Sequence, residues 1–167
     1  MGRAQGRGPL PRPFAGLVKP VEASGGLVKR GRMPMHPNEK VLRAALDAIA
    51  RGDRDAFARV VAEDVIVHFP GRSPLSGELR GRGVLAARIA ELTGGSLKIE
   101  PHDVLASDDH AVGIYLMRVD CPGKSIEWRQ VNVYHIRAGK IVEVWQNPFE
   151  QDAVDEFFSQ ASRPSRD

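Results

Sequence analysis

The second half of the sequence consists of long extended stretches separated by short turns, and this arrangement constrains the fold more than any other feature. Pro122-Gly123-Lys124 and Ala138-Gly139 are typical hairpin turns, and the stretches beside them are rich in β-branched and aromatic side chains. Pro101 indicates an edge strand or a bulge, because proline has no N–H to donate to a neighbouring strand. We therefore expect an antiparallel meander with strands over 96–106, 110–120, 126–136 and 140–146.

Amphipathic helical patterns surround this meander. Pro37 and Gly52 are placed to start and end the first helix, and Asp53 is placed to cap the second. Helices before an antiparallel sheet favour an α+β fold over a parallel βαβ fold. The predicted helices cover 38–51, 54–61, 83–93 and 152–160, with one short strand over 65–69.

The alternation of side chains divides the two longest predicted strands into two faces. One face carries Trp128, Gln130, Asn132 and Tyr134 with Val142, Val144 and Gln146, and the other carries Val131, Val133 and His135 with Ile141, Glu143 and Trp145. Both faces mix apolar and polar side chains, so both require a cover. The helices can cover one face only, and we expect a second copy of the chain to cover the other. This predicts a homodimer with Val131, Val133, Glu143 and Trp145 near its interface.

The first 34 of the 167 residues differ in composition from the remainder. They hold seven basic residues and one acid, so the rest of the chain carries 17 basic and 20 acidic residues. Three interpretations stay open for this segment: a nucleic-acid or anionic-surface arm, a disordered leader, and a translation start at Met33 or Met35. Aromatic-plus-basic repeats that stack on bases are missing, and we do not expect a nucleic-acid partner. The expected organisation is a basic leader over 1–36, a domain over 37–160 and a frayed end over 161–167.

Several functional classes are excluded by the sequence. The lone Cys121 cannot form an internal disulfide or a Cys-rich zinc site, and no apolar run approaches the roughly 18 residues of a membrane helix, so we expect a cytoplasmic protein. Gly81-x-Gly83-x-x-Ala86 matches a dinucleotide fingerprint, but a loop precedes it where that motif requires a strand. His102-Asp103 and residues 108–110 are typical of solvated turns. We expect neither a metal nor a cofactor.

Three motifs resemble those of a known superfamily. They are a strand that ends in His68-Phe69-Pro70-Gly71-Arg72-Ser73-Pro74-Leu75, the helix start Gly81-Arg82-Gly83, and the hairpin Gly139-Lys140-Ile141-Val142-Glu143-Val144-Trp145. Together with the order of the elements, they are similar to the nuclear transport factor 2-like superfamily and its SnoaL-like polyketide cyclase and ketosteroid isomerase-like branch. The resemblance implies a curved, mostly antiparallel sheet that wraps around N-terminal helices and encloses a conical pocket. It also implies a homodimer through the convex sheet face.

The residues at the expected catalytic positions depart from that branch. Its cyclases carry a His on the penultimate strand and an Asp after the hairpin Trp, where this chain has Asn132 and Gln146. Neither amide titrates, so neither serves as a general base, but both can orient a ligand by hydrogen bonds. The remaining candidate base is His68, which the resemblance places at the cavity. We expect Tyr134 to donate to a developing oxyanion, and Trp128 and Tyr115 to complete the ligand wall.

Two classes of function remain open on the sequence alone. The first is an isomerase, cyclase or hydrolase that acts on a hydrophobic polycyclic or terpenoid-like ligand. The second is a ligand-binding or dimerisation domain that has lost the acid–base pair. The substituted positions 132 and 146 are the features on which this choice depends.

Overall fold

The computed structural model describes residues 34–161. The predicted leader over 1–36 and the predicted frayed end over 161–167 therefore lie almost entirely outside the described residues. Within the described part, four helices and six strands follow the order α1 (Pro37–Arg51), α2 (Arg54–Val60), β1 (Val61–Phe69), β2 (Gly77–Arg80), α3 (Arg82–Thr93), β3 (Lys98–Ala106), β4 (His110–Cys121), β5 (Lys124–Arg137), β6 (Lys140–Pro148) and α4 (Gln151–Ala161).

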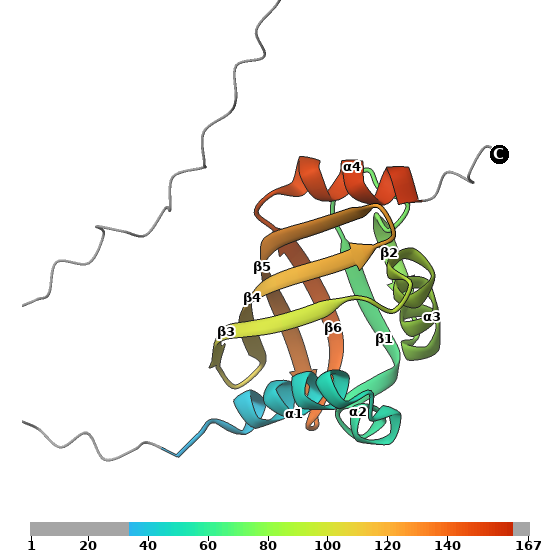
Figure 1. The fold of residues 1–167 in the computed structure, drawn as a ribbon. Helices are drawn as coiled ribbons and strands as arrows, with labels where there is room; N and C mark the ends of the chain where they lie inside the picture. The colour runs from blue at the N-terminus through green and yellow to red at the C-terminus, as the bar shows by residue number, and fades with distance from the viewer. Residues whose placement is uncertain (1–33, 162–167) are drawn as a thin grey trace, which may run out of the picture. The chain divides into compact units, whose positions relative to one another are not determined.

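The six strands form one curved, open sheet in the order β2-β1-β6-β5-β4-β3 (Figure 1). All neighbouring strands are antiparallel except β1 and β6, which are parallel. The chain between these two strands, from β2 to β5, supplies the long connection that a parallel pair needs. In Figure 1, α1 lies at one end of β1 and β6 and next to β3, α4 lies at the other end next to β5, and α3 lies beside β1. The predicted α+β fold with a curved, mostly antiparallel sheet is confirmed.

The ends of the first two helices follow from local chemistry. The ring Nδ1 of His36 accepts a hydrogen bond from the Asn38 N–H at 3.2 Å, and α1 ends at Gly52 in the left-handed conformation that glycine adopts without strain. The Asp53 carboxylate then accepts from the Ala56 N–H at 2.8 Å and starts α2. The first helix buries Leu42 and Ala45 against the sheet.

Three local predictions from the sequence are wrong. The strand β1 begins at Val61, which the helical pattern includes in the preceding helix, and the short strand β2 is not predicted at all. Two residues of β6, Val142 and Glu143, lie opposite His135 alone, which makes a β-bulge. The bulge places Ile141 and Val144 together on the concave face, whereas strict alternation assigns them to opposite faces.

Candidate functional site

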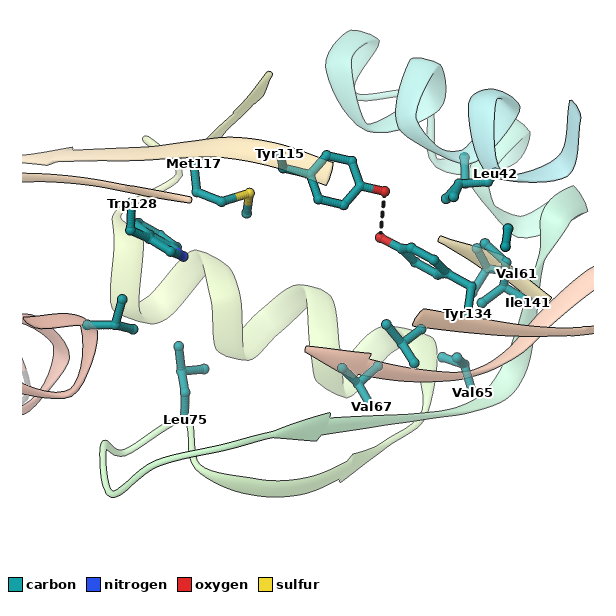
Figure 2. Close-up of a cluster of buried hydrophobic side chains, with 14 of the residues drawn as sticks. Leu42, Val61, Val65, Val67, Leu75, Tyr115, Met117, Trp128, Tyr134 and Ile141 are labelled. Atoms are coloured by element: carbon teal, nitrogen blue, oxygen red, sulfur yellow. Dashed lines mark hydrogen bonds between the residues drawn. The ribbon is translucent and has the colours of Figure 1, made fainter. Parts of the chain in front are cut away.

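A cavity of about 160 Å³ lies between the concave face of the sheet and the helices. Its walls are largely aliphatic and aromatic, and each of the four helices contributes apolar side chains to them. Figure 2 shows part of this wall, with Val65 and Val67 of β1 opposite Tyr134 and Met117 of the meander. Representative lining residues are Leu42 and Leu46 of α1, Phe57 of α2, Leu85 and Ile89 of α3, Val154 and Phe158 of α4, and Val67, Met117, Trp128 and Val144 of the sheet.

Polar side chains reach the cavity from β5 and β6. Positions 128, 130, 132 and 134 of β5 share the concave face because side chains alternate along a strand, and Asn132 lies directly opposite Gln146 of β6. We call Trp128, Gln130, Asn132, Tyr134, Gln146 and Tyr115 the polar network. Five of these six are site residues predicted from the sequence, and Gln130 is the one that is not. The signal was present, because alternation alone places Gln130 on this face.

Hydrogen bonds connect the network from end to end. The indole N–H of Trp128 donates to Gln130 Oε1 at 2.7 Å. Gln130 Nε2 donates to Asn132 Oδ1 at 2.8 Å and to Gln146 Oε1 at 2.9 Å. Asn132 Nδ2 donates to the Tyr134 hydroxyl at 3.1 Å, and this hydroxyl lies 3.0 Å from that of Tyr115. Gln130 is therefore the branch point of a network that joins β4, β5 and β6.

The two tyrosines of the network differ in position. Tyr134 lines the cavity, whereas Tyr115 is 2% exposed and lies behind it, outside the lining. The dashed line in Figure 2 marks the contact between their hydroxyl groups. Burial raises the pKa of both phenols above the ordinary value. Both groups therefore stay protonated and act as hydrogen-bond donors. Tyr115 is absent from the cavity lining among the described residues, so the structure places it one hydrogen bond behind the wall and not at the ligand position expected from the sequence.

A glycine makes the tyrosine pair possible. Gly113 of β4 lies opposite Asn132 of β5. A Cβ atom at Gly113 would lie 1.8 Å from the Tyr115 hydroxyl oxygen. The phenol of Tyr115 thus occupies the space that a side chain at 113 would take. Gly113 is required here for close packing.

His68 does not face the cavity. Val65, Val67 and Phe69 of β1 line it, so the intervening His68 points to the opposite, convex face. There its Nε2 lies 2.7 Å from Glu143 Oε1, and its ring stacks on Trp145 with centroids 5.7 Å apart. The expectation that His68 is a base inside the pocket is wrong, because the sheet separates it from any ligand held there.

The loop between β1 and β2 is fixed next to the cavity by a buried carboxylate. Asp155 of α4 accepts hydrogen bonds from the backbone N–H groups of Arg72 at 2.9 Å and Ser73 at 3.1 Å. Gly71 precedes them with φ +91°, and a Cβ there would approach the Asp155 carboxylate to 2.3 Å. Ser73 and Leu75 of this loop line the cavity, so the contact with α4 holds one of its walls.

Fold and site together define a protein built around an apolar cavity, with helices on the concave face of a curved sheet. The chain belongs to the SnoaL-like domain family, whose family model matches residues 42–144. Solved structures that share the fold include ones described as nuclear transport factor 2-like and as cystatin-like. The resemblance stated from the sequence motifs is confirmed.

Individual proteins are similar to this chain in sequence or in fold. An uncharacterized protein of Mycobacterium tuberculosis is 24% identical over 123 residues, which cover 71% of this chain and 94% of that protein. The structure of Bal32a, from a soil-derived mobile gene cassette, is similar with a TM-score of 0.68 and 27% identity over 73% of this chain and 96% of that one. IdmH of Streptomyces antibioticus, a proposed polyketide cyclase, shares the fold with a TM-score of 0.56 and 17% identity over 72% of this chain and 95% of that one.

None of the helices in the described residues is both long and apolar enough to cross a membrane.

Proposed function

We propose that this protein binds a neutral, hydrophobic small molecule in the cavity and holds it by hydrogen bonds from the polar network. The observation that carries the proposal is the chemistry of the lining. Among the described residues, the cavity wall contains no carboxylate, imidazole, amine, guanidinium or thiol. Its one ionisable group is the phenol of Tyr134, whose pKa is raised by burial. Proton abstraction by a side chain near neutral pH is therefore missing from this site.

Binding without acid–base catalysis fits the substituted positions. Asn132 and Gln146 keep the hydrogen bonds of a ligand site, and neither gains or loses a proton. An apolar cavity with a few fixed polar groups is the usual form of a small-molecule site. The geometry thus supports the ligand-binding alternative of the two functions that the sequence left open.

A second candidate is catalysis by hydrogen-bond donation alone. It is favoured by the Tyr134 phenol, which stays protonated at the cavity wall and can stabilise negative charge that develops on a substrate oxygen. Turnover of a substrate by the wild type would favour this second candidate over binding alone. For such a substrate, Tyr134→Phe tests the oxyanion role, because an enzyme that relies on this donor should lose turnover by about 10²-fold or more in the variant.

The binding proposal is tested with toluene as a probe. We expect toluene to raise the melting temperature of the wild type, because a ligand that binds only the folded state stabilises it. Val144→Phe fills part of the cavity and should abolish this increase. Val84→Phe makes the same chemical change on the exposed surface of α3 and should preserve it. The absence of any increase in the wild type, or an equal increase in Val144→Phe, contradicts the proposal.

We also propose that the convex face of the sheet forms a homodimer. Support comes from its half-buried apolar side chains, among them Val131, Val133 and Trp145, and from Leu105, which is 53% exposed. The four described helices direct their apolar side chains to the concave side instead. Light scattering at micromolar concentration should give twice the mass of one chain, and a monomer at that concentration contradicts the proposal.

A further inference from the structure

The indole of Trp128 fixes the direction of the hydrogen bonds made by the three amide side chains of the polar network. An indole N–H only donates, so the atom of Gln130 that faces it at 2.7 Å must be the amide oxygen. The oxygen and nitrogen of an amide have nearly the same shape, and a donor-only neighbour is what distinguishes them. Trp128 thus orients the side chain at the branch point.

This orientation propagates to both amides beyond Gln130. Its NH2 group faces Asn132 at 2.8 Å and Gln146 at 2.9 Å, so both of them must present their oxygens to it. Their own NH2 groups then point away from Gln130. The NH2 of Asn132 uses one hydrogen on the Tyr134 hydroxyl. Within the described residues, the NH2 of Gln146 has no hydrogen-bond partner.

The tyrosine pair extends the same polarity. The hydroxyl of Tyr115 is buried outside the lining, and Tyr134 is its hydrogen-bond partner among the described residues. The Tyr115 hydroxyl therefore donates its hydrogen to the Tyr134 oxygen, because no other acceptor among the described residues is within reach of it. This donation leaves the Tyr134 hydrogen free at the cavity. The wall thus presents unused donors on Gln146, Asn132 and Tyr134, while the oxygen of each network amide already accepts one hydrogen bond.

The size of the cavity limits what these donors can meet. An apolar cavity of about 150 Å³ engineered into another protein holds benzene, and the cavity here measures about 160 Å³. This volume suits one ring with a small substituent, and not the polycyclic or terpenoid-like ligand expected from the sequence. In the part of the chain that the structure describes, the lining holds no cation to pair with a carboxylate, so an anionic ligand would stay uncompensated.

We propose that the cavity selects a neutral ligand of about one ring that carries a hydrogen-bond acceptor, such as a ketone or ester oxygen, and that Gln146 is the residue that determines this selectivity. The inference rests on the proposed binding function. Trp128 is the positioning residue, because it fixes the orientation of Gln130 and thereby of the Gln146 amide. The geometry predicts that the ligand oxygen lies against the Gln146 NH2 group.

Two probes of nearly identical shape test this inference. Acetophenone carries a carbonyl oxygen where α-methylstyrene carries a methylene group. Each probe is titrated by calorimetry against the wild type and the variants. Affinities are compared for one probe between protein forms, so the different hydrophobicities of the two probes cancel.

Gln146→Glu reverses the polarity of the wall at constant shape. The carboxylate still accepts from Gln130, but it offers the ligand an acceptor in place of a donor. We expect acetophenone to bind roughly tenfold or more weakly, because its carbonyl loses a donor and faces an anion, while α-methylstyrene changes by less than about threefold. Gln146→Leu removes the donor without adding charge and should weaken acetophenone by roughly fivefold, again with little effect on α-methylstyrene. Asn147→Asp adds the same charge at the next, exposed position and should leave both probes unaffected.

Trp128→Phe tests the positioning role. Without the indole N–H, the Gln130 amide can rotate by half a turn and exchange its oxygen and nitrogen positions. Acetophenone should then bind the variant more weakly than the wild type, whereas the affinity for α-methylstyrene should change by less than about threefold. A merely structural role of Trp128 would weaken both probes equally. Equal changes for both probes in Gln146→Glu and Gln146→Leu, in proteins that melt cooperatively, overturn the inference and leave the binding function intact. Failure of both probes to bind the wild type overturns the inference together with that function.

Discussion

Placing a charge in the polar network should destabilise the protein in a pH-dependent way, and Asn132→Asp is the most direct change. Asn132 is 6% exposed, and the substitution keeps its shape. Gln130 can still donate to one oxygen, and Tyr134 can turn its hydroxyl to donate to the other. These two hydrogen bonds offset part of the desolvation of the new carboxylate, so we take its pKa to rise by about 2 rather than by the larger values of fully unpaired groups.

The expected penalty follows from this rise. A pKa raised by about 2 corresponds to about 2.7 kcal/mol. Because the folded-state pKa lies above the unfolded value of about 3.9, the penalty is absent below that value and grows as the pH rises. It reaches its full size above about pH 6. The difference in unfolding free energy between Asn132→Asp and the wild type should therefore be small at pH 4 and about 2.7 kcal/mol at pH 7.

Urea unfolding at the two pH values measures this difference. The control is Asn147→Asp, which adds the same charge at an exposed position and should change stability by less than about 0.5 kcal/mol at either pH. A variant at position 132 that is as stable as the wild type at pH 7 would show that water solvates this wall. An equally large loss at both pH values would show that altered hydrogen bonding, and not charge, is responsible. Either result refutes the reasoning.

The other predictions concern packing, assembly and acid stability. Gly113→Ala should lower the unfolding free energy by about 2 kcal/mol or more, because the new methyl group displaces a buried phenol. Gly83→Ala in α3 has open space around the new methyl group and should raise the unfolding free energy by about 0.5–1 kcal/mol. Calorimetric unfolding measures both changes. Trp145→Glu should convert the proposed dimer to a monomer in light scattering, and a dimeric variant contradicts the interface. Although burial raises the pKa of Glu150, the hydrogen bonds from the side chain and backbone of Arg129 outweigh it and lower this pKa. The ionised Glu150 carboxylate therefore stabilises the fold above the ordinary pKa of Glu, and this stabilisation is lost as the pH falls through the lowered pKa. The unfolding free energy of Glu150→Gln should fall less on acidification than that of the wild type.

The sequence predicts the fold well because its long alternating strands admit few arrangements. The concave placement of Asn132 and Tyr134 follows from alternation along one regular strand, and the opposite placement of Val131 and Val133 follows from the same rule. Alternation fails in β6, because the bulge at Val142 and Glu143 shifts the register and the residue types do not reveal it.

The site is less predictable than the fold, for two reasons. The resemblance to the family places His68 at the cavity. Alternation along β1 contradicts this, because it gives the cavity face to the aliphatic neighbours Val65 and Val67. The position of the Tyr115 phenol depends on Gly113, two residues earlier on the same strand, over which the ring lies. Alternation assigns Tyr115 to the concave face but does not say in which direction along β4 its ring leans. The volume of the cavity likewise depends on how far the helices stand from the sheet, and no residue pattern encodes that distance.

The measurement that tests the account most directly is the affinity of the wild type for acetophenone between pH 5 and pH 9. We infer that the ligand is held by neutral hydrogen-bonding side chains, and that no group of the lining among the described residues titrates in this range. The raised pKa of Tyr134 and the position of His68 on the opposite face both predict a dissociation constant that stays within about twofold across the range. A change of tenfold or more, or the absence of binding at every pH, would contradict the account.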